Sequence, residues 1–203
     1  MKHKVADFIE ENFPKDKLVI GVHIRAGYGK DDGNGHFDQT HRGEWINKNM
    51  TKAVSMVRKH IRMTAHSILD RFGDREKISF DKDAYDAVLD DKYRIFLATD
   101  STRVLKEFKR QDPNVLSLAQ DRIKAGEGVT IFKTPACKDS NTTTTECALM
   151  AQEAMLLDLL ILSSCDATLT ESYSNFLYSL PATLMMAEGR IFCQKCFNEM
   201  LEN

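Results

Sequence analysis

Long apolar runs are missing from this chain of 203 residues, and no stretch approaches the ~20 apolar residues that a membrane-spanning helix needs. The longest run, from Ala154 to Leu162, is interrupted by Asp158. The N-terminus is charged and amphipathic, and it lacks the apolar segment of a signal peptide. We therefore expect either a cytosolic chain or a piece cut from a longer precursor.

An excess of charge of one sign is also missing. Lys and Arg together number 28, Asp and Glu number 30, and the formal net charge is −2. This balance argues against a general nucleic-acid binder and against binding to a membrane surface. The chain is long enough for a sizeable core, and we predict one domain over residues 1–203 with a charged, exposed insertion at about 73–92.

Cysteine is scarce, and the five cysteines form no dense disulfide framework. Cys193 and Cys196 make one Cys-x-x-Cys pair, but no second pair or histidine has the local spacing of a structural zinc site. His36, Asp38 and His41 lie in a glycine-rich loop at irregular spacing, which is a weak pattern for metal ligands. We therefore predict no metal, and a disulfide stays open.

Apolar runs alternate with helical patterns along the chain, which predicts an α/β fold with a parallel sheet flanked by helices. Strands are expected where β-formers run together, and helices where apolar residues recur at helical spacing. The most hydrophobic helix follows a capping box at Thr143 and Glu146 and is expected to be central and buried. The expected strands are 19–25, 93–100, 115–118, 166–170 and 190–193; the expected helices are 2–13, 43–71, 102–111, 143–164 and 176–187.

The stretch Leu18–Lys30 carries the strongest functional signal. A predicted buried strand places His23 and Arg25 two residues apart, hence on one face at its carboxyl end, and Gly27 and Gly29 follow. Ligands of open α/β sheets bind beyond the carboxyl ends of the strands, where a guanidinium suits phosphate oxygens. Two interpretations are open here: an anionic ligand such as a nucleotide diphosphate, or an ordinary salt-bridged surface pair.

Other predicted strands also end in polar groups. Asp100 closes the strand 93–100, and either Asp100 or Ser101 can cap the helix that follows. The loop with Ser172, Ser174 and Asn175 leads into a helix start, which is either another anion site or plain helix capping. Asp158, within the apolar helix, needs a partner, and a structural hydrogen bond is the favoured role.

Three segments resemble the motifs shared by α1,6-fucosyltransferases, bacterial nodulation fucosyltransferases and protein O-fucosyltransferases. Gly21–Gly27 is similar to their His-x-Arg-x-Gly peptide, and Ile95–Asp100 to their second motif. Leu156–Asp166, running on to Ser172–Phe176, resembles the third. The three occur in the right order over about 150 residues, and the nodulation and α1,6 branch fits best.

The resemblance implies the Rossmann-like, donor-binding C-terminal half of a GT-B glycosyltransferase, which binds GDP-fucose without a metal or other cofactor and transfers fucose with inversion. It implies that Arg25 holds the β-phosphate as the catalytic group and that His23 and Gly27 lie beside the diphosphate. Asp100 would contact guanine or ribose, and Ser172, Ser174 and Asn175 would form the phosphate-binding loop.

The chain departs from the family at Ala26, where many members have a second arginine, and at Tyr28–Gly29, where several have aspartate. An acceptor domain is expected to be missing, and the acceptor, a glycan or a protein, is not identified. The alternative is a non-catalytic nucleotide-sugar-binding module. The resemblance places the chain in the Golgi or another secretory lumen if it is eukaryotic, and in the cytoplasm if it is bacterial-like.

Overall fold

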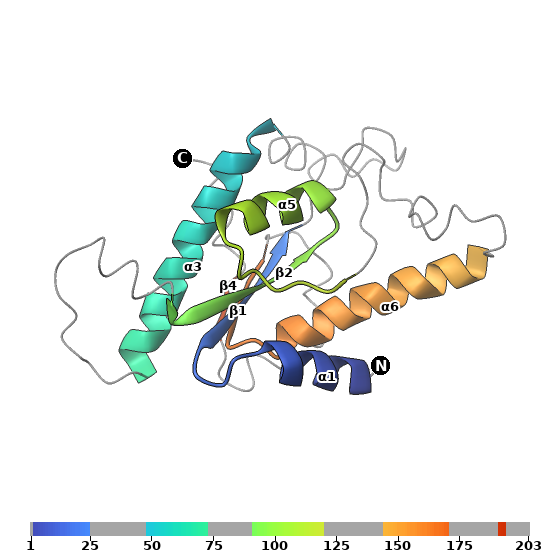
Figure 1. The fold of residues 1–203 in the computed structure, drawn as a ribbon, viewed down its shortest axis with the longest axis horizontal. Coiled ribbons are helices and arrows are strands. Elements are labelled where there is room, and N and C mark those ends of the chain that lie inside the picture. The colour runs from blue at the N-terminus through green and yellow to red at the C-terminus, as the bar shows by residue number, and fades with distance from the viewer. Residues whose placement is uncertain (1, 25–47, 73–90, 120–143, 171–190, 194–203) are drawn as a thin grey trace.

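The computed structural model describes residues 2–24, 48–72, 91–119, 144–170 and 191–193 (Figure 1). Its element order is α1 (Lys2–Asn12), β1 (Leu18–Ile24), α3 (Met50–Phe72), β2 (Tyr93–Thr99), α5 (Thr102–Gln111), α6 (Thr144–Ser163), β3 (Ala167–Thr170) and β4 (Ile191–Cys193). The predicted fold class is confirmed: it is an α/β fold whose parallel sheet is flanked by helices.

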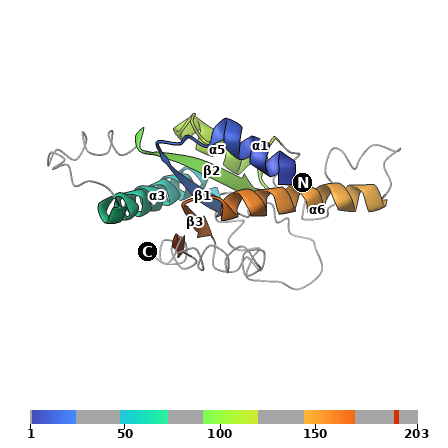
Figure 2. The same ribbon diagram turned by 90° about the horizontal axis from the view of Figure 1, so that it is seen from below.

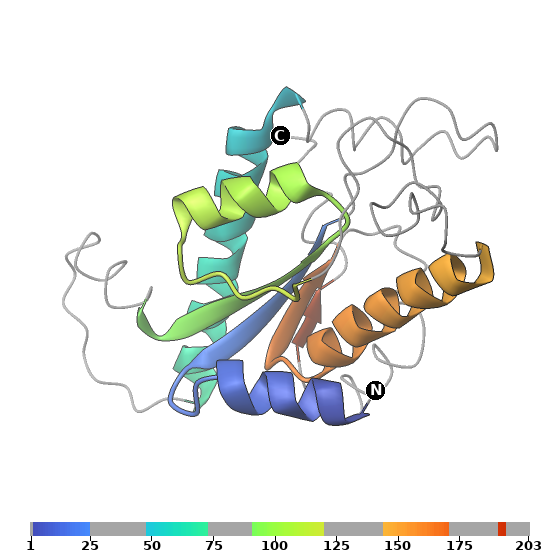
Figure 3. The ribbon, with the colours of Figure 1, turned by 45° about the vertical axis from the view of Figure 1, so that its right-hand side comes forward.

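The sheet has four strands in the order β2-β1-β3-β4, and every neighbouring pair is parallel. Figure 3 shows the strands side by side, with β1 between β2 and β3. Six of the seven residues of β1 are buried, as expected for a strand that helices cover on both faces. Strands buried on both faces have continuous runs of β-forming residues in their sequence, not an alternation of apolar and polar residues.

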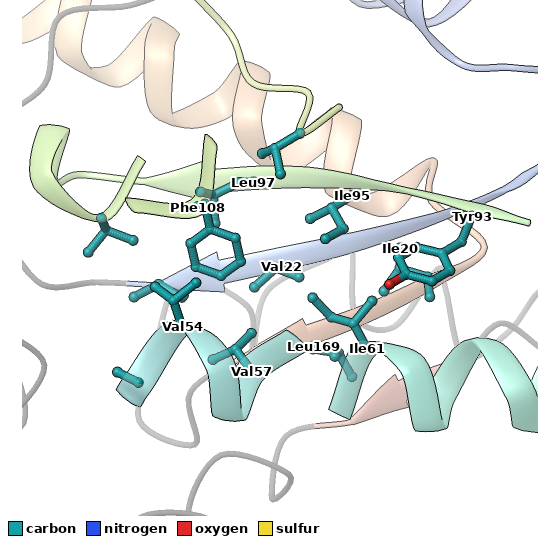
Figure 4. Packing of buried hydrophobic residues seen from close by; sticks show 14 of the residues in the cluster. Ile20, Val22, Val54, Val57, Ile61, Tyr93, Ile95, Leu97, Phe108 and Leu169 are labelled. Carbon is teal, nitrogen blue, oxygen red and sulfur yellow. The ribbon is translucent and has the colours of Figure 1, made fainter. Parts of the chain in front are cut away.

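The larger core lies between the sheet and the two helices α3 and α5. Alternate residues of β1 and β2 point to this side and pack on α3 and on Phe108 of α5 (Figure 4). Its fully buried members include Ile20, Val22, Ile61, Ile95, Leu97 and Phe108. The apolar stripe of α3 is therefore core packing, as its helical spacing predicts.

The opposite face of the sheet is covered by α1 and α6, which contact each other (Figure 2). Phe96 of β2 meets Phe8 edge-to-face at a centroid distance of 5.7 Å, and Phe13 lies 6.5 Å from Phe96. Lys4 of α1 donates to Glu153 of α6 at 2.7 Å. This second core explains why the helix before Pro14 is amphipathic.

Most element predictions inside the described residues are confirmed, and the helix 102–111 agrees at both ends. The strand predicted at 115–118 is wrong. The chain meets β2 only through Leu116, whose N–H donates to Ile95 O at 2.8 Å and whose carbonyl accepts from Leu97 N at 2.9 Å. The segment leaves the sheet after this one bridge, so it forms no further strand hydrogen bonds with β2.

The prediction that α6 is a central buried element holds for only part of the helix. Its C-terminal half lies on the sheet, with Ile161 and Leu162 fully buried. Its N-terminal half exposes large apolar side chains, including Leu149 at 59% and Met150 at 50%. A 20-residue helix is ~30 Å long, whereas the longest strands, β1 and β2, have seven residues and span ~23 Å. The sheet therefore ends before the helix does.

Several expectations fall outside the described residues: the start of the helix predicted at 43–71, most of the 73–92 insertion, Thr143 of the capping box, and the helix at 176–187. No helix among the described residues is long and apolar enough to cross a membrane.

Gly21 of β1 marks a close contact between the sheet and α6. A Cβ built at this position would lie 2.8 Å from Leu162 Cδ2, 3.0 Å from Thr168 Oγ1 and 3.1 Å from Cys165 Sγ. Thr168 is held in turn, because its hydroxyl donates to the carbonyl of Leu162 at 2.9 Å. A side chain at position 21 therefore has no room unless the helix moves.

We predict that Gly21→Ala lowers the free energy of unfolding by about 1–3 kcal/mol, the usual cost of overpacking a core. Denaturant unfolding of Gly21→Ala, Leu162→Ala and the double variant measures it. Leu162→Ala removes the atom nearest to the new Cβ. The double variant should therefore lose less unfolding free energy than the sum of the losses of the two single variants. Strict additivity would mean that the contact does not limit position 21.

The C-terminal turn of α5 is tied to α3 by a polar network around Glu107. Arg110 Nε donates to Glu107 Oε2 at 2.9 Å, and Gln111 Nε2 donates to Glu107 Oε1 at 2.8 Å. Arg58 of α3 donates to the carbonyl of Gln111 at 3.0 Å. The hydrogen bonds from Arg110 and then Gln111 lower the pKa of Glu107 to about 2.

This lowered pKa predicts a pH dependence of stability. A carboxyl with a folded pKa below its unfolded value stabilises the fold above the unfolded value, and that contribution is lost as the pH falls from about 4.5 through about 2. Glu107→Gln should therefore cost about 1 kcal/mol at pH 7 and almost nothing near pH 2. Urea unfolding at both pH values tests this. Glu11→Gln, at an exposed position of α1, is the matched control and should leave the free energy of unfolding unchanged at both pH values. An equal loss at both pH values for Glu107→Gln would contradict the prediction.

Candidate functional site

The carboxyl ends of β2, β1 and β3 lie next to one another at one edge of the sheet. The register pairs Ile24 with Thr99, and it pairs His23 with Ala98 on one side and with Thr170 on the other. Segments separated by about 75 and 147 residues in the sequence therefore meet at this edge. Open α/β sheets bind their ligands here.

His23 lies on the face of the sheet that α6 covers. It is two residues from Gly21, and the residues of β1 and β2 that share this face, Val19, Phe96 and Ala98, belong to the core under α6. His23 is 9% exposed, and its register partner Thr170 is 1% exposed. A histidine and a threonine are thus buried side by side at the end of the sheet.

Asp100 directly follows β2 and is partly buried, but it does not cap α5. Ser101 does so: its hydroxyl accepts from Val104 N at 3.3 Å, and its own N–H donates to Thr99 Oγ1 at 3.2 Å. Of the two capping residues open from the sequence, the structure thus has Ser101. The carboxylate at the strand end is not the capping group of the helix.

The opposite, amino edge of the sheet carries polar groups of another kind. Asp166 clamps β1 to β3, since its carboxylate accepts from Val19 N at 2.7 Å and its N–H donates to Val19 O at 2.9 Å. Lys17 pairs with Asp91 at 2.6 Å, which lowers the pKa of Asp91. These groups hold strands in register, so the carboxyl edge is the candidate functional site.

Of the predicted site residues, the structure describes His23 and Asp100. It places both at the carboxyl edge, His23 in β1 and Asp100 directly after the neighbouring strand β2. Arg25, Gly27, Ser172, Ser174 and Asn175 lie outside the described residues. Thr170 was not anticipated as a neighbour of His23, because its pairing depends on the register between β1 and β3. No signal in the sequence gives that register.

Within the described residues, no group of three or more His, Cys, Asp or Glu side chains could hold a metal ion. Cys165 is buried under α6, and its thiol donates to Ile161 O at 3.3 Å. His36, Asp38, His41 and Cys196 lie outside the described part of the chain.

The capping assignment can be tested by stability. Ser101→Ala should lower the free energy of unfolding by about 1 kcal/mol, the usual cost of losing a helix N-cap. Asp100→Asn, a substitution at the preceding residue that keeps the size of the side chain, should change the free energy of unfolding by less than half as much. Chemical unfolding of both variants is the measurement, and a larger loss for Asp100→Asn would return the capping role to Asp100.

The sequence matches no protein-family model and no curated protein sequence. Among solved structures, it is similar to selenomethionine fucosyltransferase NodZ from Bradyrhizobium, with 17% identity over 87% of this chain and 39% of that chain, at a TM-score of 0.47. It is also similar to NodZ alpha-1,6-fucosyltransferase soaked with GDP-fucose, with 15% identity over 90% of this chain and 40% of that chain (TM-score 0.45). The form co-crystallised with GDP gives 16% identity over 87% and 39% of the two chains (TM-score 0.40). This chain thus spans about two-fifths of the length of these structures.

Proposed function

We propose that this chain is the donor-binding domain of a fucosyltransferase, the Rossmann-like C-terminal half of a GT-B enzyme, and that it binds GDP-fucose without a metal. The observation that carries the proposal is that the strands that belong to the three motifs, or adjoin them, are neighbours in the sheet. The strands that lead into the His-x-Arg motif, the second motif and the third motif are neighbours in the order β2-β1-β3. An accidental resemblance would not require these strands to be adjacent.

The proposed roles follow the chemistry of a sugar diphosphate. Arg25 follows β1 directly and would grip the β-phosphate in two places, as a planar guanidinium can. His23 and Gly27 would lie beside the diphosphate, and Asp100 would accept hydrogen bonds from guanine or ribose. Ser172, Ser174 and Asn175, in the chain after β3, would complete the phosphate site.

The proposed reaction transfers fucose to a hydroxyl of a glycan or protein with inversion at the anomeric carbon. The acceptor oxygen bonds to that carbon as the bond to the β-phosphate oxygen breaks, and GDP leaves with the electron pair. Negative charge therefore grows on the β-phosphate, where Arg25 would stabilise it most in the transition state. The acceptor proton would pass to a base; Asp31, Asp32 and Asp38 are the acidic candidates in the loop after β1.

We predict that GDP and GDP-fucose bind in the presence of EDTA and that UDP and ADP bind less tightly. Calorimetric titration of the wild-type chain with the four nucleotides measures this. Arg25→Lys should weaken GDP by about one to two decades, because a point charge does not replace the guanidinium fork. Its melting temperature should stay unchanged.

The matched control is Arg110→Lys, at the far end of α5, which should leave GDP affinity unchanged. Loss of binding on chelation would contradict the metal-free site. A destabilised Arg25→Lys that binds GDP normally would remove Arg25 from it. Tight GDP-fucose binding with no transfer by the longest available form of the protein would support the non-catalytic module instead.

A further inference from the structure

The helices on the two faces of the sheet carry opposite charge. On the face of the larger core, α3 has five Lys and Arg residues against one acidic residue, and α5 has four against one. On the other face, α1 has two lysines against three acidic residues, and α6 has three acidic residues and no Lys or Arg. The chain thus has a basic layer and an acidic layer on opposite sides of the sheet, although its net charge is only −2.

The exposed cations of α3 and α5 form one continuous surface. Lys52 and Lys59 share a face of α3 with Ser55, whose hydroxyl donates to Gln111 Oε1 at 3.4 Å, so this face adjoins the end of α5. Helix α5 buries Phe108, and its cations lie on the opposite, outer side. The basic surface, as we call it, consists of the exposed side chains Lys52, Lys59, Arg103, Lys106 and Lys109.

The fold itself does not account for these cations. Within the part of the chain that the structure describes, their side chains have no ion pair or hydrogen bond, whereas Arg58 and Arg110 both bind groups of α5. Lys52 and Arg103 lie in the first turns of α3 and α5, which contain no acidic residue. The helix dipole disfavours a cation there, so helix stability does not explain these two residues.

The opposite side of the molecule presents carboxylates next to exposed apolar side chains. Lys4 of α1 donates to Glu153 of α6 at 2.7 Å, which places two helix faces side by side. Residues three, four or seven positions away share these faces. On α1 they include carboxylates without an ion pair among the described residues, and on α6 they include large apolar side chains. The acidic surface, as we call it, consists of the exposed residues Asp7, Glu11, Leu149 and Leu156.

We propose that the basic surface of one copy of this chain binds the acidic surface of a second copy. The two surfaces are opposite in charge, and the exposed leucines supply apolar area to the contact. A net charge of −2 leaves little repulsion between copies. Nucleic acid or anionic lipid would use the basic surface alone and would leave the acidic surface without a role, which is why a second copy is the favoured partner.

The symmetry of this contact follows from where the two surfaces lie. They are on opposite sides of the sheet, so each copy offers one surface to each of two neighbours. A twofold dimer would bring like charges together. The contact is therefore head-to-tail and builds rows or rings of copies.

Sedimentation velocity of the whole chain over a range of concentrations, at about 0.05 M and about 0.5 M salt, tests the contact. At the lower salt we expect the weight-average mass to rise above that of the monomer with concentration. At the higher salt, which screens exposed charges, we expect the monomer. Lys59→Glu with Lys106→Glu should give the monomer at both salt concentrations, and so should Asp7→Lys with Glu11→Lys. Mixing these two variants should restore the larger species, because each reversed surface is then complementary to a surface of the other variant.

The matched control is Lys15→Glu with Lys92→Glu, which makes the same change of net charge at exposed positions before β1 and β2. It should associate like the wild type. A wild type that is monomeric at the lower salt overturns the proposal, whatever the variants do. Association that the charge reversals leave intact, or a mixture of the two variants that stays monomeric, also overturns it.

Other partners of the basic surface give a different result. A monomeric chain that binds RNA or phosphatidylserine vesicles, and loses that binding with the lysine substitutions but not with those of α1, would assign the basic surface to that partner and overturn self-association. No nucleotide sugar is present in these measurements. Failure of GDP binding would therefore defeat the proposed function and leave this result intact.

Discussion

The absence of a side chain at Gly21 is the constraint on which the arrangement of this domain depends. It lets α6 approach the central strand so closely that Leu162, Cys165 and Thr168 fill the space that a Cβ would need. Strand β3 begins a few residues after α6, so the same contact sets where the third strand joins the sheet. It also sets which residue of β3 pairs with His23, namely Thr170. One position thus couples packing to the site.

The two edges of the sheet carry polar groups of different kinds. At the amino edge, Asp166 and the pair of Lys17 with Asp91 bind strands to one another at short distances. At the carboxyl edge, Ser101 satisfies the start of α5, and Asp100 and His23 remain outside that capping scheme. His23 and Asp100 therefore lie on the side where α/β sheets bind ligands.

The sequence predicts the individual strands and helices well because burial leaves a local mark. Strands covered on both faces are continuous runs of β-formers, and the cap at Ser101 defines where α5 begins. Which elements become neighbours in space cannot be read from such local patterns. The strand order, and with it the pairing of His23 with Thr170, depends on which apolar surfaces meet. The prediction of a strand at Leu116 failed, and that of a buried α6 held only in part, for the same reason. The sequence shows that these segments are apolar, but it does not show which other elements pack on them.

The division between the edges also explains why the clamp at Asp166 matters for a site at the other end of the sheet. Side chains alternate along a strand, so a slip of one residue between β1 and β3 would send His23 to the α3 face and bring Ile24 beneath α6. The two hydrogen bonds between Asp166 and Val19 oppose that slip directly before the first pair of the ladder, Ile20 with Ala167. The apolar faces oppose it too, because Ile20 and Val22 would leave the larger core. The position of the imidazole is therefore determined by the packing of the whole strand, and any ligand at the carboxyl edge would meet a site whose geometry the core has already set.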